Sequence, residues 1–381
     1  MRGLALGRAA LGPLGWGPWL RLEARGSLLV VGPTQAGKTA SIVVPALLDW
    51  DGPAVVTSVK SDVVQVTRAW RERLGRVQVL EPGREHGLSW DPLEAVDGLR
   101  SALRAASELT SRASAHADSE FWNALASKLV GALFVLVRER GGGIRDVVAA
   151  VESRDLEVLA RGGGQAGRML EDFLAHEART LDGVLTTAET MLLPWRLDQP
   201  LARVRDVLEG PNTLFLVGPR GQQRSYEGLF RGALASVLEA QQLRVESGRG
   251  HPLLLVLDEA ALVAPLEDLD EMAASLAGLG VTLLSVVQDF AQLHARWGPR
   301  AATIVNNHTS RLVLGGLADP QVSTFLPEAL GPGATSLRRL GRGRGVLVCG
   351  SAPVRRLRLV PWWRRHRLRR RGQRALATMP R

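Results

Sequence analysis

The chain has 381 residues, of which 45% are hydrophobic and 23% are charged. This ordinary globular composition excludes collagen-like, disulfide-stabilised and intrinsically disordered classes of protein. The formal net charge is +10, but residues 338–381 contain 15 Arg and no Asp, Glu or Lys. The first 337 residues therefore carry 33 basic and 38 acidic side chains, a net charge of −5. The positive charge belongs to the C-terminal segment, and the rest of the protein is slightly acidic.

Cysteine content and hydropathy indicate the compartment. The single cysteine, Cys349, excludes a disulfide within the chain and argues against a cysteine-based metal site, which favours a reducing compartment. We find no run of about 18 apolar residues, the length that a membrane-spanning helix needs. The start of the chain is apolar in patches, but glycines, prolines and Arg8 interrupt it. These features predict a cytoplasmic protein with no transmembrane helix in this chain.

Apolar runs and helical stretches alternate at the start of the chain. Runs at residues 27–31, 53–58 and 77–81 predict buried strands, and helices are predicted at residues 40–50 and 62–74. Strands that alternate with helices are typical of a parallel sheet with crossover helices.

The hydrophobic period then becomes helical, from about residue 93 to residue 208. We expect an all-α insertion there, with candidate helices at residues 102–114, 121–138, 144–160 and 166–191. Strand-like runs return afterwards at residues 212–217, 252–257 and 281–287, with helices at 226–246 and 269–279 and late strands at 311–314 and 346–349.

A phosphate-binding loop follows the first of these strands. Residues 32–39 match G-x-x-x-x-G-K-[ST], and the glycines let backbone N–H groups close around phosphate oxygens. Lys38 is expected to reach the β- and γ-phosphates, and the Thr39 hydroxyl to bind Mg²⁺. Only three of the 48 basic residues are lysines, which makes a lysine at this position informative. The candidate nucleotide-binding residues are Gly32, Pro33, Thr34, Gln35, Ala36, Gly37, Lys38 and Thr39.

Carboxylates directly follow a second buried strand. Asp258 is the candidate second Mg²⁺ ligand, directly or through water, and Glu259 is the candidate base that deprotonates the attacking water. The simpler alternative is a helix N-terminus, where acidic side chains suit the dipole. Gln288 ends the next strand; in RecA-like ATPases an amide there contacts the γ-phosphate, although a polar residue ending a strand is also ordinary. The candidate catalytic residues are therefore Glu259, Gln288 and Lys38.

These motifs predict an α/β fold: a RecA-like P-loop NTPase with a mostly parallel sheet and an inserted all-α domain. The predicted segments are an N-terminal segment at residues 1–24, a nucleotide-binding domain at 25–92 and 209–360, the all-α insertion at 93–208, and a basic C-terminal tail at 361–381. Lys60 and Asp62 follow the strand at residues 53–58. The sequence leaves two roles open for this pair: a contact with nucleotide or substrate, or a surface salt bridge.

Several ordered motifs together resemble the type IV secretion coupling proteins, the TraG/TraD-like conjugative ATPases. The P-loop with residues 44–48 and 55–60 resembles the start of that family, and Phe121-Trp122 is similar to the start of its all-α domain. Residues 258–266, residues 288–293 and the stretches that continue to residue 319 are similar to its C-terminal TraM-recognition region. The resemblance covers roughly residues 25–362.

The resemblance implies a homo-hexameric, RecA-like motor that uses ATP and Mg²⁺. Such a motor moves DNA, single- or double-stranded, or a protein–DNA substrate such as a relaxase complex, toward a type IV secretion channel or its membrane subunit. It implies the roles given above for Lys38, Thr39, Asp258, Glu259 and Gln288. It also implies a cytoplasmic protein that can lie peripherally at the inner face of the cell membrane.

Two departures from the family stand out. Members usually carry N-terminal membrane helices, so we expect that this chain belongs to a soluble, actinobacterial-type branch, acts beside a separate membrane subunit, or has lost its start. Many members also place an Arg just before the strand that ends in the Gln, as a finger for the neighbouring subunit. Residues 276–280 contain no Arg, which leaves Arg220, Arg224 or Arg311 as substitutes, or slow hydrolysis.

Two other functions remain as alternatives. One is a FtsK/HerA-like pump for double-stranded DNA; the helical insertion and residues 258–266 argue against it. The other is a nucleotide-binding substrate adaptor without hydrolysis, which the intact Asp258-Glu259 pair disfavours and the missing finger permits.

The basic C-terminal tail has three interpretations. It binds nucleic-acid phosphates with stacking tryptophans, or lies on an anionic membrane, or is a merely solvated end; the tryptophans could also cap the core. The candidate contacts with DNA or membrane are Trp362, Trp363, Arg364, Arg365, Arg367, Arg369, Arg370 and Arg371.

Overall fold

The computed structural model describes residues 3–10, 17–59, 61–84, 87–110, 117–161, 163–218, 221, 223–263, 266–317 and 340–377. The chain divides into two compact units. The sheet unit comprises Met1–Gln78, Asp206–Val217 and Gln241–Arg381, and the helical unit comprises Val79–Arg205 and Gly218–Ala240. The helical unit therefore begins earlier than the predicted insertion at residues 93–208 and takes up a second segment.

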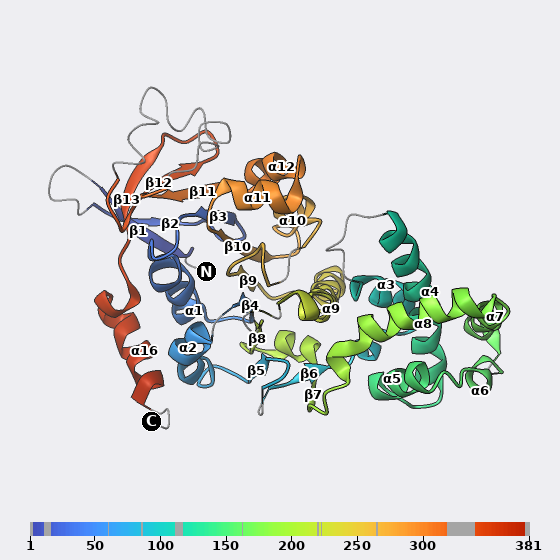
Figure 1. Cartoon of the computed structure of the whole chain (residues 1–381). Helices are drawn as coiled ribbons and strands as arrows, with labels where there is room; N and C mark the ends of the chain where they lie inside the picture. The colour runs from blue at the N-terminus through green and yellow to red at the C-terminus, as the bar shows by residue number, and fades with distance from the viewer. Residues whose placement is uncertain are drawn as a thin grey trace. The chain divides into compact units, whose positions relative to one another are not determined.

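The sheet unit is built on a sheet of 11 strands in the order β2-β1-β13-β12-β11-β3-β10-β9-β4-β8-β5 (Figure 1). Its central neighbours, from β11 to β8, pair in parallel, and the edge from β2 to β11 pairs antiparallel. The strands are β1 (Ala5–Ala9), β2 (Trp19–Arg21), β3 (Ser27–Val31), β4 (Ala54–Ser58), β5 (Val77–Leu80), β8 (Thr213–Val217), β9 (Leu253–Leu257), β10 (Val281–Val287), β11 (Ser310–Leu314), β12 (Arg344–Cys349) and β13 (Arg355–Arg358).

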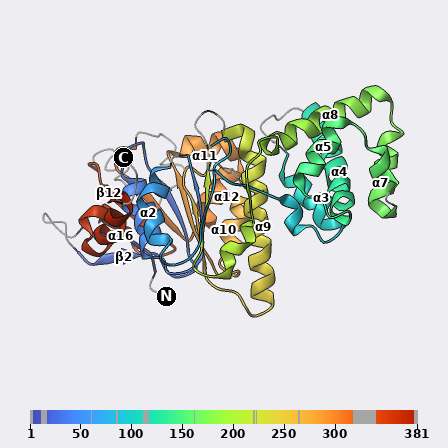
Figure 2. The same ribbon diagram turned by 90° about the horizontal axis from the view of Figure 1, so that it is seen from below.

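Helices cover both faces of this sheet. Figure 2 shows α2 and α16 on one face and α10, α11 and α12 on the other. Parallel strands are buried on both sides in this arrangement, which is why β3, β4, β8, β9 and β10 are apolar runs without alternation. The helices are α1 (Val44–Asp49), α2 (Asp62–Arg71), α10 (Leu269–Ser275), α11 (Phe290–Trp297), α12 (Arg300–Asn307) and α16 (His366–Ala377), and α9 (Glu227–Glu246) crosses the boundary between units.

The helical unit holds α3 (Leu99–Glu108), α4 (Ala117–Glu139), α5 (Ile144–Ser153), α6 (Glu157–Ala160), α7 (Gly164–Leu174) and α8 (Ala178–Leu192). A two-stranded sheet, β6 (Ser89–Trp90) with β7 (Leu201–Ala202), belongs to the same unit. The single helix predicted at residues 166–191 is wrong, because the chain breaks into α7 and α8 at Ala175–Glu177 although no Gly or Pro marks the place.

Helix α4 is the core helix of this unit. It packs against α3, α5, α7 and α8, and Leu129, Leu133, Phe134 and Leu136 are fully buried. In the described part of the chain, Ser119–Glu139 is the one stretch long and apolar enough to cross a membrane, and half of its most apolar window is buried. Burial in a core accounts for that apolar character.

Both ends of the chain differ from the predicted elements. In the N-terminal segment, β1 pairs with β2 and with β13, so this segment extends the sheet. The C-terminal residues from His366 to Ala377 form helix α16, which packs against α2 and α1. A solvated end is therefore the wrong interpretation for that stretch. Helices α11 and α12 were also not predicted.

Candidate functional site

The phosphate-binding loop leaves the carboxyl end of β3, whose residues are all buried. Gly32 lies against the neighbouring strand: a Cβ there would lie 2.8 Å from Leu314 Cβ, so a side chain would not fit. Gln35 (φ 65°) and Gly37 (φ 92°) have left-handed backbone conformations, and the second of these requires glycine in practice. The loop thus has the compact form that turns backbone N–H groups inward.

Lys38 is folded into this loop. Its side chain is 7% exposed, and Nζ donates to the carbonyl oxygens of Gly32 and of Pro33, the latter at 3.1 Å. Burial lowers the pKa of Lys38, and the carboxylates of Glu259, Asp258 and Asp289 oppose that effect. The ammonium group is therefore held at the loop by weak acceptors that phosphate oxygens can replace.

Asp258 and Thr39 are paired at the end of β9. Asp258 is 4% exposed, its backbone N–H donates to Thr57 O at 3.2 Å, and the Thr39 side chain hydrogen-bonds its carboxylate. Burial raises the pKa of Asp258 to about 7, and the charges of Glu259 and Asp62 add to the increase, while Lys38 and Thr39 oppose it.

The same pair fits a magnesium ion. A hydroxyl and a carboxylate are the hard oxygen ligands that Mg²⁺ prefers, usually one or two from the protein with the rest from phosphates and water. Among the described residues, no group of three or more His, Cys, Asp or Glu could form a complete metal cage. The donor set therefore suits a cation that is shared with a bound phosphate.

Glu259 and Gln288 form the next pair. Gln288 directly follows β10, and its Nε2 donates to Glu259 Oε2 at 3.0 Å. Glu259 itself has φ 58°, a left-handed conformation that non-glycine residues rarely adopt. Asp289 then caps α11 by accepting from Gln292 N at 2.6 Å, so the element after Gln288 is fixed. The acidic pair does not form a helix N-terminus, because Glu259 lies in a turn.

Strand register brings these pairs to one edge of the sheet. Val31 of β3 lies beside Val287 of β10, and Ser285 of β10 lies beside Leu257 of β9. The residues that follow these strands, the P-loop, Gln288 and the Asp258-Glu259 pair, therefore leave the sheet together, with the Gln288 strand in the middle. Asp62 also lies close enough to raise the pKa of Asp258.

Of the candidate arginines, Arg311 is the one whose side chain the structure describes, and it does not join this group. Arg311 lies inside β11 beside Leu29 of β3, and its Nε is buried without a hydrogen bond. Lys60, Arg220 and the side chain of Arg224 lie outside the described residues. The sequence motifs assign no role in the site to Asp289, although its negative charge raises the pKa of Lys38. The signal for it in the sequence is its position directly after Gln288.

The predicted C-terminal contacts divide into two sets. Trp362 is 8% exposed and packs in a cluster with Val44, Leu48 and Leu368. Arg365 is also buried, and Arg371 is half-buried with its guanidinium 4.2 Å from the centre of the Trp70 ring. The exposed set consists of Trp363, Arg364, Arg367, Arg369 and Arg370.

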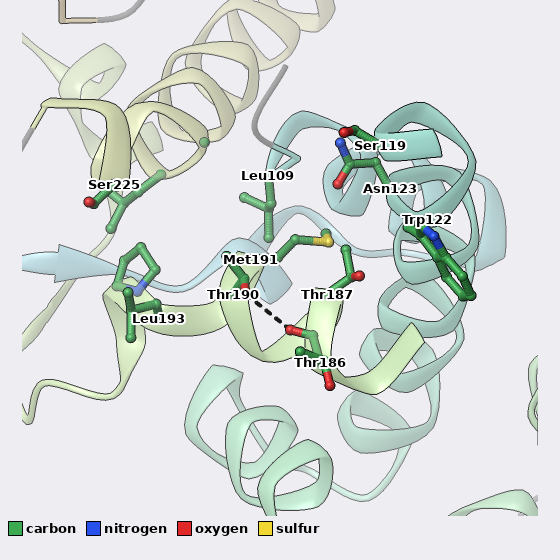
Figure 3. Close-up of a pocket in the computed structure, with 13 residues that line it drawn as sticks. Leu109, Ser119, Trp122, Asn123, Thr186, Thr187, Thr190, Met191, Leu193 and Ser225 are labelled. Atoms are coloured by element: carbon green, nitrogen blue, oxygen red, sulfur yellow. Dashed lines mark hydrogen bonds between the residues drawn. The ribbon is translucent and has the colours of Figure 1, made fainter. Parts of the chain in front are cut away.

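A separate cavity of about 510 Å³ lies in the helical unit, and no P-loop residue is among its described lining residues (Figure 3). Trp122, Thr187 and Met191 are among its lining residues, which are uncharged in the described part of the chain. Trp122 is only half-buried, and Phe121 is 56% exposed. Thr190 Oγ1 donates to the Thr186 carbonyl at 3.0 Å, so that hydroxyl presents acceptor lone pairs.

Two family models match this chain. The model of the type IV secretory system conjugative DNA transfer family matches residues 10–189, and that of the TraM recognition site of TraD and TraG matches residues 252–347. The chain belongs to the type IV secretion coupling proteins. It is 26% identical to the conjugal transfer protein TraG of Escherichia coli in an alignment 321 positions long, which covers 73% of this chain and 50% of that protein. The chain thus spans about half the length of the curated relatives it matches.

Solved structures of coupling proteins share the fold. The unbound conjugative coupling protein TrwBΔN70 aligns with a TM-score of 0.72 at 18% identity, over 90% of this chain and 87% of that one. TrwB in complex with ADP and Mg²⁺ aligns with a TM-score of 0.69 at 17% identity, over 89% and 85%. The RecA-like P-loop fold predicted from the sequence is confirmed.

Proposed function

We propose that this coupling protein is an ATP-driven translocase that delivers DNA, or a protein–DNA substrate, to a type IV secretion channel. The observation that carries the proposal is the Glu259–Gln288 pair at the sheet edge where Lys38, Thr39 and Asp258 meet. A protein that only bound nucleotide would need the P-loop but not a carboxylate placed to activate water. The TrwB complex with ADP and Mg²⁺ supports the choice of ligands.

The residues have separate tasks in ATP hydrolysis. The P-loop N–H groups and Lys38 hold the phosphates, and Thr39 and Asp258 hold Mg²⁺, which neutralises phosphate charge when it is bound. Glu259 accepts a proton from the attacking water. The water oxygen forms a bond to the γ-phosphorus as the bond from that phosphorus to the β–γ bridging oxygen breaks.

Gln288 couples hydrolysis to movement in this proposal. Its amide contacts the base Glu259, and its strand leads directly into α11 through the Asp289 cap. Loss of the γ-phosphate changes the hydrogen bonds that the Gln288 amide can make, and the resulting movement passes to α11. The proposed assembly is a homo-hexamer whose partners are DNA, a relaxase or other secretion substrate, and a channel or membrane subunit, with the chain working at the cytoplasmic side of the membrane.

The exposed face of the C-terminal segment is the proposed DNA contact. Arg364, Arg367 and Arg370 are exposed there, next to Trp363, which is 46% exposed. The apolar side of α16 is already used, because Leu368 packs with Val44 and Leu48. A helix whose apolar side is occupied offers charge and one aromatic ring, which fits a phosphate chain with unstacked bases better than insertion into a membrane.

The test is the ATPase rate of the wild type with no DNA, with single-stranded DNA and with double-stranded DNA. We expect hydrolysis that DNA stimulates, and Glu259→Gln in parallel to abolish it. Stimulation by double strands only would favour a FtsK/HerA-like pump. No hydrolysis under any of these conditions would overturn the translocase and favour an adaptor.

A further inference from the structure

Pro45 interrupts the helix that carries the P-loop residues Lys38 and Thr39. The chain from Thr39 to Val43 forms a wider π-type turn before α1 begins at Val44. Proline has no N–H, so Pro45 cannot donate to the carbonyl of Ser41, which an α-helix would pair with it. Ser41 is 1% exposed, and a buried carbonyl without a partner is costly.

Arg365 supplies a donor to that carbonyl. Its Nη2 donates to Ser41 O at 2.9 Å, while Nε donates to Val360 O at 2.9 Å and Nη1 donates to Ala5 O at 3.2 Å. The side chain is 8% exposed, and burial lowers its pKa to about 10, so it remains a cation at neutral pH. Because the donor is charged, these three hydrogen bonds hold the three backbone segments together strongly.

A second residue of the C-terminal segment lies close to the P-loop. Leu359 Cδ1 lies 3.8 Å from the position that a Cβ on Gly37 would occupy, so the segment touches the P-loop itself. The Ser41 N–H donates to Gly37 O at 2.9 Å. One residue, Ser41, therefore connects the P-loop on its N–H side to Arg365 on its carbonyl side.

We propose that Arg365 is a positioning residue of the nucleotide site, which holds the first turn after the P-loop so that Lys38 and Thr39 are set for phosphate and Mg²⁺. The proposal rests on the proposed nucleotide-binding function. It makes the C-terminal segment part of the ATPase site and assigns its buried arginine a role different from that of its exposed ones.

The test compares Arg365→Ala with Arg356→Ala, an exposed arginine of β13, in the full chain. Binding of a fluorescent ADP analogue with Mg²⁺ is titrated, and thermal unfolding is followed on the same samples. We expect Arg365→Ala to weaken binding about tenfold, the effect of losing one charge-assisted hydrogen bond, and Arg356→Ala to leave it unchanged. Equal affinities in the two variants, with only the unfolding temperature lowered in Arg365→Ala, would overturn the proposal.

A second pair of variants tests the contact with Ser41. Pro45→Ala returns an N–H to the helix, so Arg365→Ala should cost clearly less affinity in that background than alone. The same tenfold loss in both backgrounds would contradict positioning through Ser41. If Arg365→Ala does not fold, Arg365→Lys, which keeps the charge but not the three-way geometry, replaces it in the same comparison. Failure of the wild type to bind the analogue would instead refute the nucleotide-binding function.

Discussion

Gln288 donates a hydrogen bond to Glu259 across 3.0 Å, and the two residues follow adjacent strands, β10 and β9, of one parallel sheet. The bond orients the carboxylate that we assign as the base and joins it to the strand in the middle of the site. The base and the residue proposed to report phosphate loss are therefore one unit. A change in either should affect hydrolysis through the other.

Replacing Gln288 tests that unit. We expect Gln288→Ala to lower kcat about 10- to 100-fold, because the base loses the group that orients it, and to leave KM for ATP nearly unchanged. Steady-state kinetics at saturating Mg²⁺ measure both. A change confined to KM would show that Gln288 only helps to bind nucleotide.

The raised pKa of Asp258 predicts a pH dependence of Mg²⁺ binding. Its pKa is about 7 in the protein, so the carboxylate must lose a proton to bind the cation. We expect the affinity for Mg²⁺ in the presence of ADP to rise between pH 6 and pH 8 by about tenfold. Asp258→Asn should remove this slope, and a slope that survives in the variant would assign the proton to another group.

The burial of His308 predicts that the protein loses stability in acid. It is fully buried between Ile304 O and Ser285, and burial lowers its pKa to about 4, with Arg311 adding to the effect. The folded state binds this proton less readily than the unfolded state, so the contribution is complete above about pH 6.5 and is lost as the pH falls toward 4. His308→Gln should flatten that part of the urea-unfolding profile by up to about 3 kcal/mol, whereas the exposed His366→Gln should not.

Replacing Arg71 should lower the free energy of unfolding strongly without a direct effect on catalysis. It is fully buried, and it donates to the carbonyls of Trp50 and Gly52 and to Thr213 Oγ1 at 2.5, 2.7 and 2.6 Å. Arg71→Ala leaves these acceptors unpaired and should cost about 3 kcal/mol in urea unfolding. The exposed Arg73→Ala is the control, and an equal effect of the two would contradict this account.

The exposed C-terminal arginines predict the salt dependence of DNA binding. Replacing Arg364, Arg367 and Arg370 by Ala should reduce the slope of log affinity against log salt by about 2 for single strands. The same number of exposed arginines replaced in the helical unit serves as control. An unchanged slope, together with lost binding to vesicles that contain anionic lipid, would favour the membrane instead.

Motifs with local spacing were the predictable part of this protein. The P-loop, Asp258-Glu259 and Gln288 each follow an apolar run, so their strands and common edge could be inferred without the structure. The pairing of β1 with β13 could not, because it joins residues about 350 positions apart through two short strands, the first of which contains a glycine. No local pattern marks such a partner.

The C-terminal segment shows a different limit. Its dense arginines suggested a solvated or ligand-binding end, but Leu368 and Trp362 are placed to bury one side of a helix. Arg365 is buried because distant carbonyls accept its hydrogen bonds. One of them is the Ser41 carbonyl, to which Pro45 has no N–H to donate. Charge composition alone cannot separate an arginine that serves the fold from one that faces solvent.

The central claim is that Glu259 activates water for ATP hydrolysis. Its most direct measurement is single-turnover phosphate release from bound Mg-ATP, for the wild type and for Glu259→Gln, with nucleotide affinity measured on the same proteins. The account predicts unchanged affinity within a few-fold and release slowed by about 10²- to 10⁴-fold, the range of a lost general base. Release at the wild-type rate in Glu259→Gln would contradict it.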